Sequence, residues 1–173
     1  YRGLVDKLLI VAPGHLKYQW MREMKEKFQE QFRIVDRTSM DSAWGQNVFE
    51  EETQLIASID FAKQDDVMAS IKDSKWDLII IDEAHKMSAY QYGNKTNKTA
   101  RYKFGELASE ITNYMIMLTA TPHRGDDENF RLFLDLLEPG FFADTEMLAQ
   151  SINEKDNPLF LRRLKEDMKA FDG

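Results

Sequence analysis

The segment Trp76–His85 constrains the fold of this chain more than any other part of the sequence. Leu78–Ile81 is a run of consecutive aliphatic residues that leads directly into Asp82-Glu83-Ala84-His85. A short apolar run without alternation predicts a strand that is buried on both faces of a parallel sheet. Open α/β sheets bind ligands beyond the carboxyl ends of their strands, which is where Asp82 and Glu83 are expected. Two acids there suit holding Mg²⁺ through water and orienting an attacking water, although they could also merely cap the next helix.

Strands and helices are expected to alternate along the chain, which predicts a mainly parallel α/β sheet flanked by helices. The apolar runs that predict buried strands lie at residues 7–13, 33–36, 54–59, 76–82 and 113–120. Apolar residues at helical spacing predict helices around residues 16–28, 42–52, 60–71, 104–111 and 127–137. Asp60 is expected to cap the third of these helices. The polar segment Tyr90–Thr99 is expected to be a mobile loop.

Length and composition limit the class of protein. At 173 residues the chain forms one ordinary domain, and no apolar run approaches the ~20 residues of a membrane span. The absence of Cys excludes a disulfide framework and a thiolate zinc site, and it fits a reducing cytoplasm. The net charge of −7 argues against binding nucleic acid through bulk charge alone, although Lys86–Lys103 holds several basic residues and no acid.

Several segments stand in an order that resembles a known family. These segments are Leu9–Leu16 followed by Gln19-Trp20, then Ile56–Lys63, Ile81–His85, Leu118–Pro122 and Phe160–Asp167. They resemble motif Ia, a DNA-facing motif, the DEAH box (motif II), motif III and the segment that leads toward a second RecA-like domain in superfamily 2 helicase-type ATPases. Within that superfamily the chain is similar to the Swi2/Snf2 duplex-DNA translocases, and to their bacterial RNA-polymerase-associated (RapA-like) branch. The resemblance implies a RecA-like domain that hydrolyses ATP to move along duplex DNA and remodel protein–DNA complexes.

The resemblance also implies a role for each residue of the ATPase site. Asp82 would hold Mg²⁺ through water, and Glu83 would position and deprotonate the water that attacks ATP. His85 would contact Thr119 or Thr121 and so link the nucleotide to motif III. The motif III residues that would couple the nucleotide to domain closure are Thr119, Ala120 and Thr121.

Two loops are implied to face the DNA backbone. Their residues are Pro13, Gly14, His15 and Ser58. Each loop opens a helix whose free backbone N–H groups could meet a phosphate, but each could also be an ordinary strand-to-helix turn. Part of the basic segment Lys86–Lys103 is expected to touch DNA or to regulate the site. The implied partners are double-stranded DNA, ATP, and RNA polymerase or other DNA-bound proteins, in a prokaryotic cytoplasm near the nucleoid.

The sequence contains no Gly-x4-Gly-Lys-[Ser/Thr] loop, and Gly93–Thr96 lacks the earlier Gly that such a loop needs. We therefore expect a fragment in which Tyr1–Gly3 ends the P-loop helix, so that the P-loop strand and the phosphate-binding Lys are missing. Alone, this fragment should bind ATP weakly and not hydrolyse it. Residues 1–143 would form a partial RecA-like domain and residues 144–173 a helical tail. The strand at 113–120 would become an open apolar edge, which predicts dimerisation or strand addition.

Two other functions compete with this one. The first is a noncatalytic interaction module, a degenerate helicase domain that has lost its P-loop. The second is a metal-dependent hydrolase that uses His15, His85, His123 and Asp82. Nothing in the spacing of these residues resembles HExxH or another tight set of metal ligands.

Overall fold

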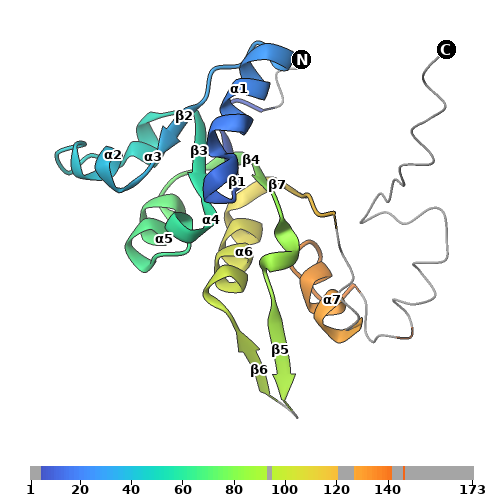
Figure 1. The fold of residues 1–173 in the computed structure, drawn as a ribbon. Helices are drawn as coiled ribbons and strands as arrows, with labels where there is room; N and C mark the ends of the chain where they lie inside the picture. Colours follow the sequence, from blue (N-terminus) through green and yellow to red (C-terminus); the bar gives the residue numbers. More distant parts are fainter. Residues whose placement is uncertain (1–4, 93–94, 121–126, 142–145, 147–173) are drawn as a thin grey trace, which may run out of the picture.

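The computed structural model describes residues 5–92, 95–120, 127–141 and 146, and the description below concerns these residues (Figure 1). The strands are β1 (Leu8–Ala12), β2 (Arg33–Val35), β3 (Gln54–Ser58), β4 (Trp76–Ile81), β5 (Ala89–Tyr92), β6 (Lys95–Lys98) and β7 (Thr112–Met117). The α-helices are α1 (Lys17–Phe28), α2 (Arg37–Asp41), α3 (Val48–Glu51), α4 (Ile59–Ala62), α5 (Asp65–Lys72), α6 (Ala100–Ile111) and α7 (Asp127–Leu134). Two short 3-10 helices are η1 (Gly14–Leu16) and η2 (Ala84–Lys86).

One five-stranded sheet organises the fold. Its strands lie in the order β2-β3-β1-β4-β7, and every pair is parallel (Figure 1). The central strand β1 lies between β3 and β4, where Leu9 is paired with Leu55 on one side and Ile79 on the other. All three of these side chains are fully buried. The mainly parallel α/β sheet flanked by helices is therefore confirmed.

The two faces of the sheet bury different cores, because side chains alternate along each strand. Leu9 and Val11 point into the larger core, to which α3, α5, α6 and α7 also contribute. Ile10 points to the opposite face and packs beneath α1, where Trp20 and Met24 cover it. Among the helices that the structure describes, α1 is the one that covers this face, and Trp20 lies beside the end of β4.

The strand β7 forms the edge of the sheet next to β4. Against the described residues, one of its faces is partly buried, because Met115 and Met117 pack against the larger core. Tyr114, Ile116 and Leu118 are exposed by 59%, 44% and 38%, so the prediction of a strand buried on both faces is wrong. The prediction that this strand lies at an apolar edge of the sheet is confirmed among the described strands. The reason is the position of α1, which packs chiefly against β2 and β3 and leaves that face of β7 uncovered.

The segment Tyr90–Thr99 is not the loop that we predicted. β5 and β6 pair antiparallel, with Ala89 opposite Lys98 and Tyr92 opposite Lys95. This hairpin projects away from the main sheet, and α7 packs beside β5 (Figure 1). The sequence signal was available, because Gly93-Asn94 between two short segments is typical of a two-residue hairpin turn.

Two helix predictions also need correction. Of the predicted helix at 42–52, only the stretch of α3 is α-helical; α2 has already ended at Asp41, and Trp44 and Gly45 between the two helices have positive φ angles. Asp60 does not cap a helix. Ser58 caps α4 by accepting a hydrogen bond from the backbone N–H of Phe61, at 3.2 Å, and Asp60 lies inside that helix. Of the predicted tail at 144–173, all but residue 146 lies outside the described residues. Among the described helices, none has both the length and the apolar character required to cross a bilayer.

Candidate functional site

The carboxyl ends of the parallel strands bring the predicted site residues to one edge of the sheet. Backbone hydrogen bonds continue past the ends of the strands: the N–H of Asp82 donates to Val11 at 2.8 Å, and the N–H of Leu118 donates to Ile81 at 2.8 Å. The N–H of Ala84 then donates to the carbonyl of Leu118 at 2.9 Å. The segment after β4 is thus tied to the end of β1 on one side and to the end of β7 on the other.

The carboxylate of Asp82 is held by two N–H donors. Its Oδ1 accepts from the backbone N–H of Glu83 at 2.8 Å, and its Oδ2 accepts from the indole N–H of Trp20 at 2.8 Å. Each carboxylate oxygen keeps a further lone pair, so Asp82 can still accept bonds from water ligands of an ion. Sequence reasoning assigned Trp20 only to the apolar face of a helix and to motif Ia. The sequence offered one indication of this contact, because the indole N–H of a partly buried Trp usually donates to a hydrogen-bond acceptor.

Glu83 has an unusual backbone conformation. Its φ of 52° and ψ of 39° lie in the left-handed region, which costs a residue with a Cβ roughly 1–2 kcal/mol. Such strain persists where the surrounding contacts hold the backbone in place, and it concentrates at functional sites. Two hydrogen bonds hold the Glu83 backbone in place here: the Glu83 N–H donates to Asp82, and the Ala84 N–H donates to the carbonyl of Leu118. The strained turn directs the Glu83 side chain toward His85.

His85 connects the acids to the end of β7. Its Nδ1 lies 3.1 Å from the hydroxyl oxygen of Thr119 and 3.3 Å from Oε2 of Glu83. The His85 side chain is only 7% exposed, so this is an interior contact. The contact with Thr119 is one of the two that the resemblance implied. Ala120 follows as an exposed residue, and Thr121 lies outside the described residues.

The donor set fits Mg²⁺ held in the manner of a nucleotide-dependent enzyme. Mg²⁺ usually binds through one or two carboxylates, several waters and the phosphates of the substrate. Asp82 offers one such carboxylate at a strand end, with Glu83 beside it. Among the residues that the structure describes, no three His, Cys, Asp or Glu side chains gather into an all-protein metal site. Nothing in that part of the chain therefore supports the hydrolase built on His15, His85 and Asp82, and His123 lies outside it.

The residues predicted to face DNA also lie at this edge. Ala12 is paired with Ser58, and a Cβ built on Gly14 would lie 4.0 Å from Cβ of Ser58. The loops after β1 and β3 are therefore adjacent. Gly14 and His15 are exposed, whereas Pro13 is buried and its carbonyl accepts the N–H of Leu16 at 2.9 Å.

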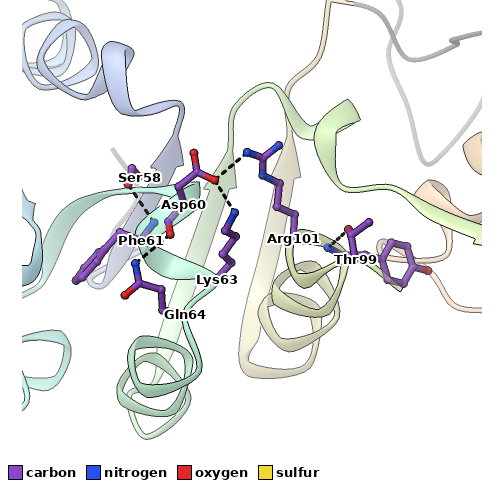
Figure 2. A network of polar contacts seen from close by, with 8 residues as sticks. Ser58, Asp60, Phe61, Lys63, Gln64, Thr99 and Arg101 are labelled. Carbon is purple, nitrogen blue, oxygen red and sulfur yellow. Dashed lines mark hydrogen bonds and ion pairs between the residues drawn. The ribbon is translucent and has the colours of Figure 1, made fainter. Parts of the chain in front are cut away.

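A polar network beside these loops was not foreseen from the sequence. Asp60, the second residue of α4, accepts hydrogen bonds from Lys63 and from Arg101, which is the second residue of α6 (Figure 2). Hydrogen bonds from the two cations lower the pKa of Asp60 from 3.8 to about 2, and the bond from Lys63 has the larger effect. Arg101 belonged to the predicted basic segment. Its pairing with Asp60, and the pairing of Lys63 with the same carboxylate, could not be predicted from spacing along the chain.

An all-parallel sheet with acids beyond the carboxyl end of a buried strand, and a histidine joining them to the next strand, is the architecture of a RecA-like α/β domain. Comparison with protein-family models matches residues 2–171 to the SNF2-related domain. The chain belongs to this SNF2-related family.

Relatives and solved structures agree with that assignment. The chain is 31% identical over 146 residues to the RNA polymerase-associated protein RapA of Pseudomonas aeruginosa (strain LESB58), which covers 83% of this chain and 15% of RapA. It is 30% identical over 158 residues to the uncharacterized ATP-dependent helicase YqhH of Bacillus subtilis (strain 168), which covers 91% of this chain and 25% of YqhH. The Sulfolobus solfataricus SWI2/SNF2 ATPase core in complex with dsDNA matches with a TM-score of 0.63 at 20% identity, over 97% of this chain and 32% of that one. At that identity the structural match shows the fold alone.

Proposed function

We propose that this chain carries the water-activating and Mg²⁺-holding side of the ATPase site of a DNA translocase. The observation that carries the proposal is the connected set at the end of β4, in which Asp82 and Glu83 are joined through His85 to Thr119. Membership in the SNF2-related family supports it. The chain spans 15% of the length of the RapA relative that it matches, so the activity of a whole protein remains part of the proposal.

The geometry assigns a task to each side chain. Asp82, fixed by Trp20 and by the Glu83 N–H, would accept hydrogen bonds from water ligands of Mg²⁺. When bound, Mg²⁺ supplies charge neutralisation for the phosphate oxygens. Glu83 would orient the attacking water and take its proton, since its side chain is one-third exposed and can reach solvent. His85 would relay a shift of Glu83 to Thr119, because it touches both.

Nucleic acid would bind along the same edge of the sheet. Gly14 and His15 are exposed in the loop after β1, and Ser58 lies beside them at the end of the neighbouring strand β3. Pro13 contributes by ending β1, since it is buried and cannot itself meet a phosphate. Two features outside this chain agree: one solved structure with this fold holds dsDNA, and a relative is named as associated with RNA polymerase. We infer duplex DNA as the track, with RNA polymerase or other DNA-bound proteins as the objects that are remodelled.

ATP turnover with and without duplex DNA tests the proposal, measured in the longest natural protein that contains this chain. We expect Mg²⁺-dependent turnover that DNA stimulates. Asp82→Asn should raise the Mg²⁺ concentration that turnover requires. Thr119→Val should keep the basal rate and reduce the stimulation by DNA, and Thr38→Val, an exposed threonine of α2, serves as the matched control.

The same assay separates the competing functions. The 173-residue chain alone should not turn over ATP, because it contains no Gly-x4-Gly-Lys-[Ser/Thr] loop. Turnover by that chain would contradict the expectation. A complete absence of ATP turnover in every form of the protein would instead support the noncatalytic interaction module.

A further inference from the structure

Two cations that are distant in the sequence meet at one carboxylate oxygen. The ammonium of Lys63 lies 2.7 Å from Oδ1 of Asp60, and the guanidinium of Arg101 donates to the same oxygen at 2.8 Å (Figure 2). Lys63 comes from the end of α4 and Arg101 from the start of α6. A simple tie between these two helices would need only one cation. This cluster instead carries an excess of positive charge, in a chain whose net charge is −7.

The cluster lies next to the loops that were predicted to face DNA. Asp60 is two residues after Ser58, which caps α4 and whose Cβ lies 4.0 Å from a Cβ built on Gly14. The Asp60 side chain is 59% exposed, whereas those of Lys63 and Arg101 are about one-third exposed. The cluster therefore opens to solvent on the side of Asp60, while the stems of the two cations are packed and held in place.

The guanidinium of Arg101 is not fully used within the described residues. Its Nη2 donates to Asp60, but its Nε is buried without a hydrogen-bond partner among them. A guanidinium presents several N–H donors in one plane and matches the oxygens of a phosphate through two of them at once. Because the Nε is buried, a further anion could meet only the terminal amino groups, and Asp60 accepts only one of their N–H bonds, so the cation retains the capacity to bind a further anion.

The neighbouring lysine of the same basic segment behaves differently. Lys98 pairs with Glu106 at 2.6 Å, and its ammonium lies 5.9 Å from the centre of the Tyr102 ring. It faces along α6 and its charge is matched one to one. The structure thus separates the basic residues of the predicted segment: Arg101 lies beside the DNA-facing loops, and Lys98 does not.

We propose that Lys63 and Arg101 form a binding site for a backbone phosphate of duplex DNA, and that Asp60 holds the two cations in place and limits their affinity. This inference rests on the proposed function, because it assumes that DNA follows the carboxyl edge of the sheet. A phosphate at the open side of the cluster is attracted by the two cations and repelled by the one carboxylate. Phosphate contacts of this kind position a protein on DNA without reading its sequence.

Duplex DNA binding by the longest natural protein that contains this chain, measured by fluorescence anisotropy at several salt concentrations, tests the site. Lys63→Gln and Arg101→Gln should each reduce the slope of log K against log[salt] by about 0.9, the value for one lost phosphate contact. Asp60→Asn should bind DNA several-fold more tightly, because the cations remain and the competing carboxylate is gone. Arg101→Lys should keep the slope, and Lys98→Gln, the matched control, should change neither slope nor affinity more than twofold.

The outcomes distinguish this site from the proposed function. If the wild-type form of that longer protein binds no duplex DNA, both ideas fall. If it binds DNA but Lys63→Gln and Arg101→Gln leave the slope unchanged, or Lys98→Gln reduces it equally, only the phosphate site is overturned. Asp60→Asn gives an independent reading in a variant that keeps both cations. Tighter binding supports the site, whereas weaker or unchanged binding by a variant with native circular dichroism contradicts it.

Discussion

The hydrogen bond between Trp20 and Asp82 should be energetically significant, and Trp20→Phe is the change that tests it. The substitution keeps an aromatic ring on α1 and removes the N–H that donates to the Asp82 carboxylate at 2.8 Å. Hydrogen bonds to charged groups contribute about 1.5–3 kcal/mol to stability. Because both partners are only half-buried, we expect the lower end, a loss of about 1.5 kcal/mol in the free energy of unfolding.

The smaller ring of Phe would also lose packing against Ile10, so the single variant does not isolate the hydrogen bond. A double-mutant cycle with Asp82→Ala does, because packing losses cancel in the coupling energy. Urea unfolding followed by far-UV circular dichroism suits this cycle, since that signal comes chiefly from the backbone, whereas fluorescence would depend on the Trp that is removed. Trp44→Phe is the matched control, because the Trp44 side chain is 95% exposed.

We expect a coupling energy of about 1.5 kcal/mol between positions 20 and 82, and less than about 0.5 kcal/mol between positions 44 and 82. Equal coupling in the two cycles would refute the reasoning. In that case the indole of Trp20 would not fix the Asp82 carboxylate, and the position of that carboxylate would depend on the Glu83 backbone alone.

Further predictions concern the same edge of the sheet and the core behind it. The pKa of Asp60 is lowered to about 2, so its pairing with the two cations stabilises the fold above the unfolded pKa of about 3.9. The free energy of unfolding of the wild type should therefore fall between about pH 4 and pH 2. In acid unfolding, Asp60→Asn should lose this pH dependence. In urea unfolding, the free energy of unfolding of Glu83→Gly should exceed that of Glu83→Ala by about 1 kcal/mol, because only glycine adopts the positive φ without cost; equal stability would show that the turn is unstrained. Tyr102→Phe should lose about 1–2 kcal/mol of stability, because the carbonyl of Leu132 would lose a buried partner at 2.9 Å, and a change below about 0.5 kcal/mol would argue against that bond. The edge strand β7 should make the chain self-associate in analytical ultracentrifugation, and Ile116→Lys should abolish this; a wild-type chain that stays monomeric at high concentration would count against the association.

The main sheet could be predicted from sequence because its strands are marked by local composition. The apolar runs around Leu9, Leu55 and Ile79 carry the signal of burial on both faces, and these side chains are all fully buried. The acids after β4 could be placed for the same reason, since a parallel sheet collects its carboxyl ends at one edge. The contact of His85 with Thr119 was expected from the family resemblance, not from composition.

The errors arose where tertiary contacts outweighed local pattern. Asp60 has the residue type of a helix cap, but Ser58 occupies that position and Asp60 binds Arg101 from another helix. The apolar residues of β7 suggested burial on both faces. Burial of the second face depends on where α1 packs, and the sequence of β7 itself carries no information on the position of that distant helix. The contact of Trp20 with Asp82 was missed for the same reason, because it joins two segments that the sheet brings together.

The central claim is that Glu83 activates water for ATP hydrolysis, and the turnover rate of Glu83→Gln tests it most directly. The rate is measured with saturating ATP, Mg²⁺ and duplex DNA, in the longest natural protein that contains this chain. Glu26→Gln, at an exposed position of α1, is the matched control. A general base contributes roughly 10²–10⁴-fold to rate, so Glu83→Gln should fall by that factor while its DNA affinity and the rate of the control stay unchanged. Turnover by Glu83→Gln within twofold of the wild-type rate would contradict the account.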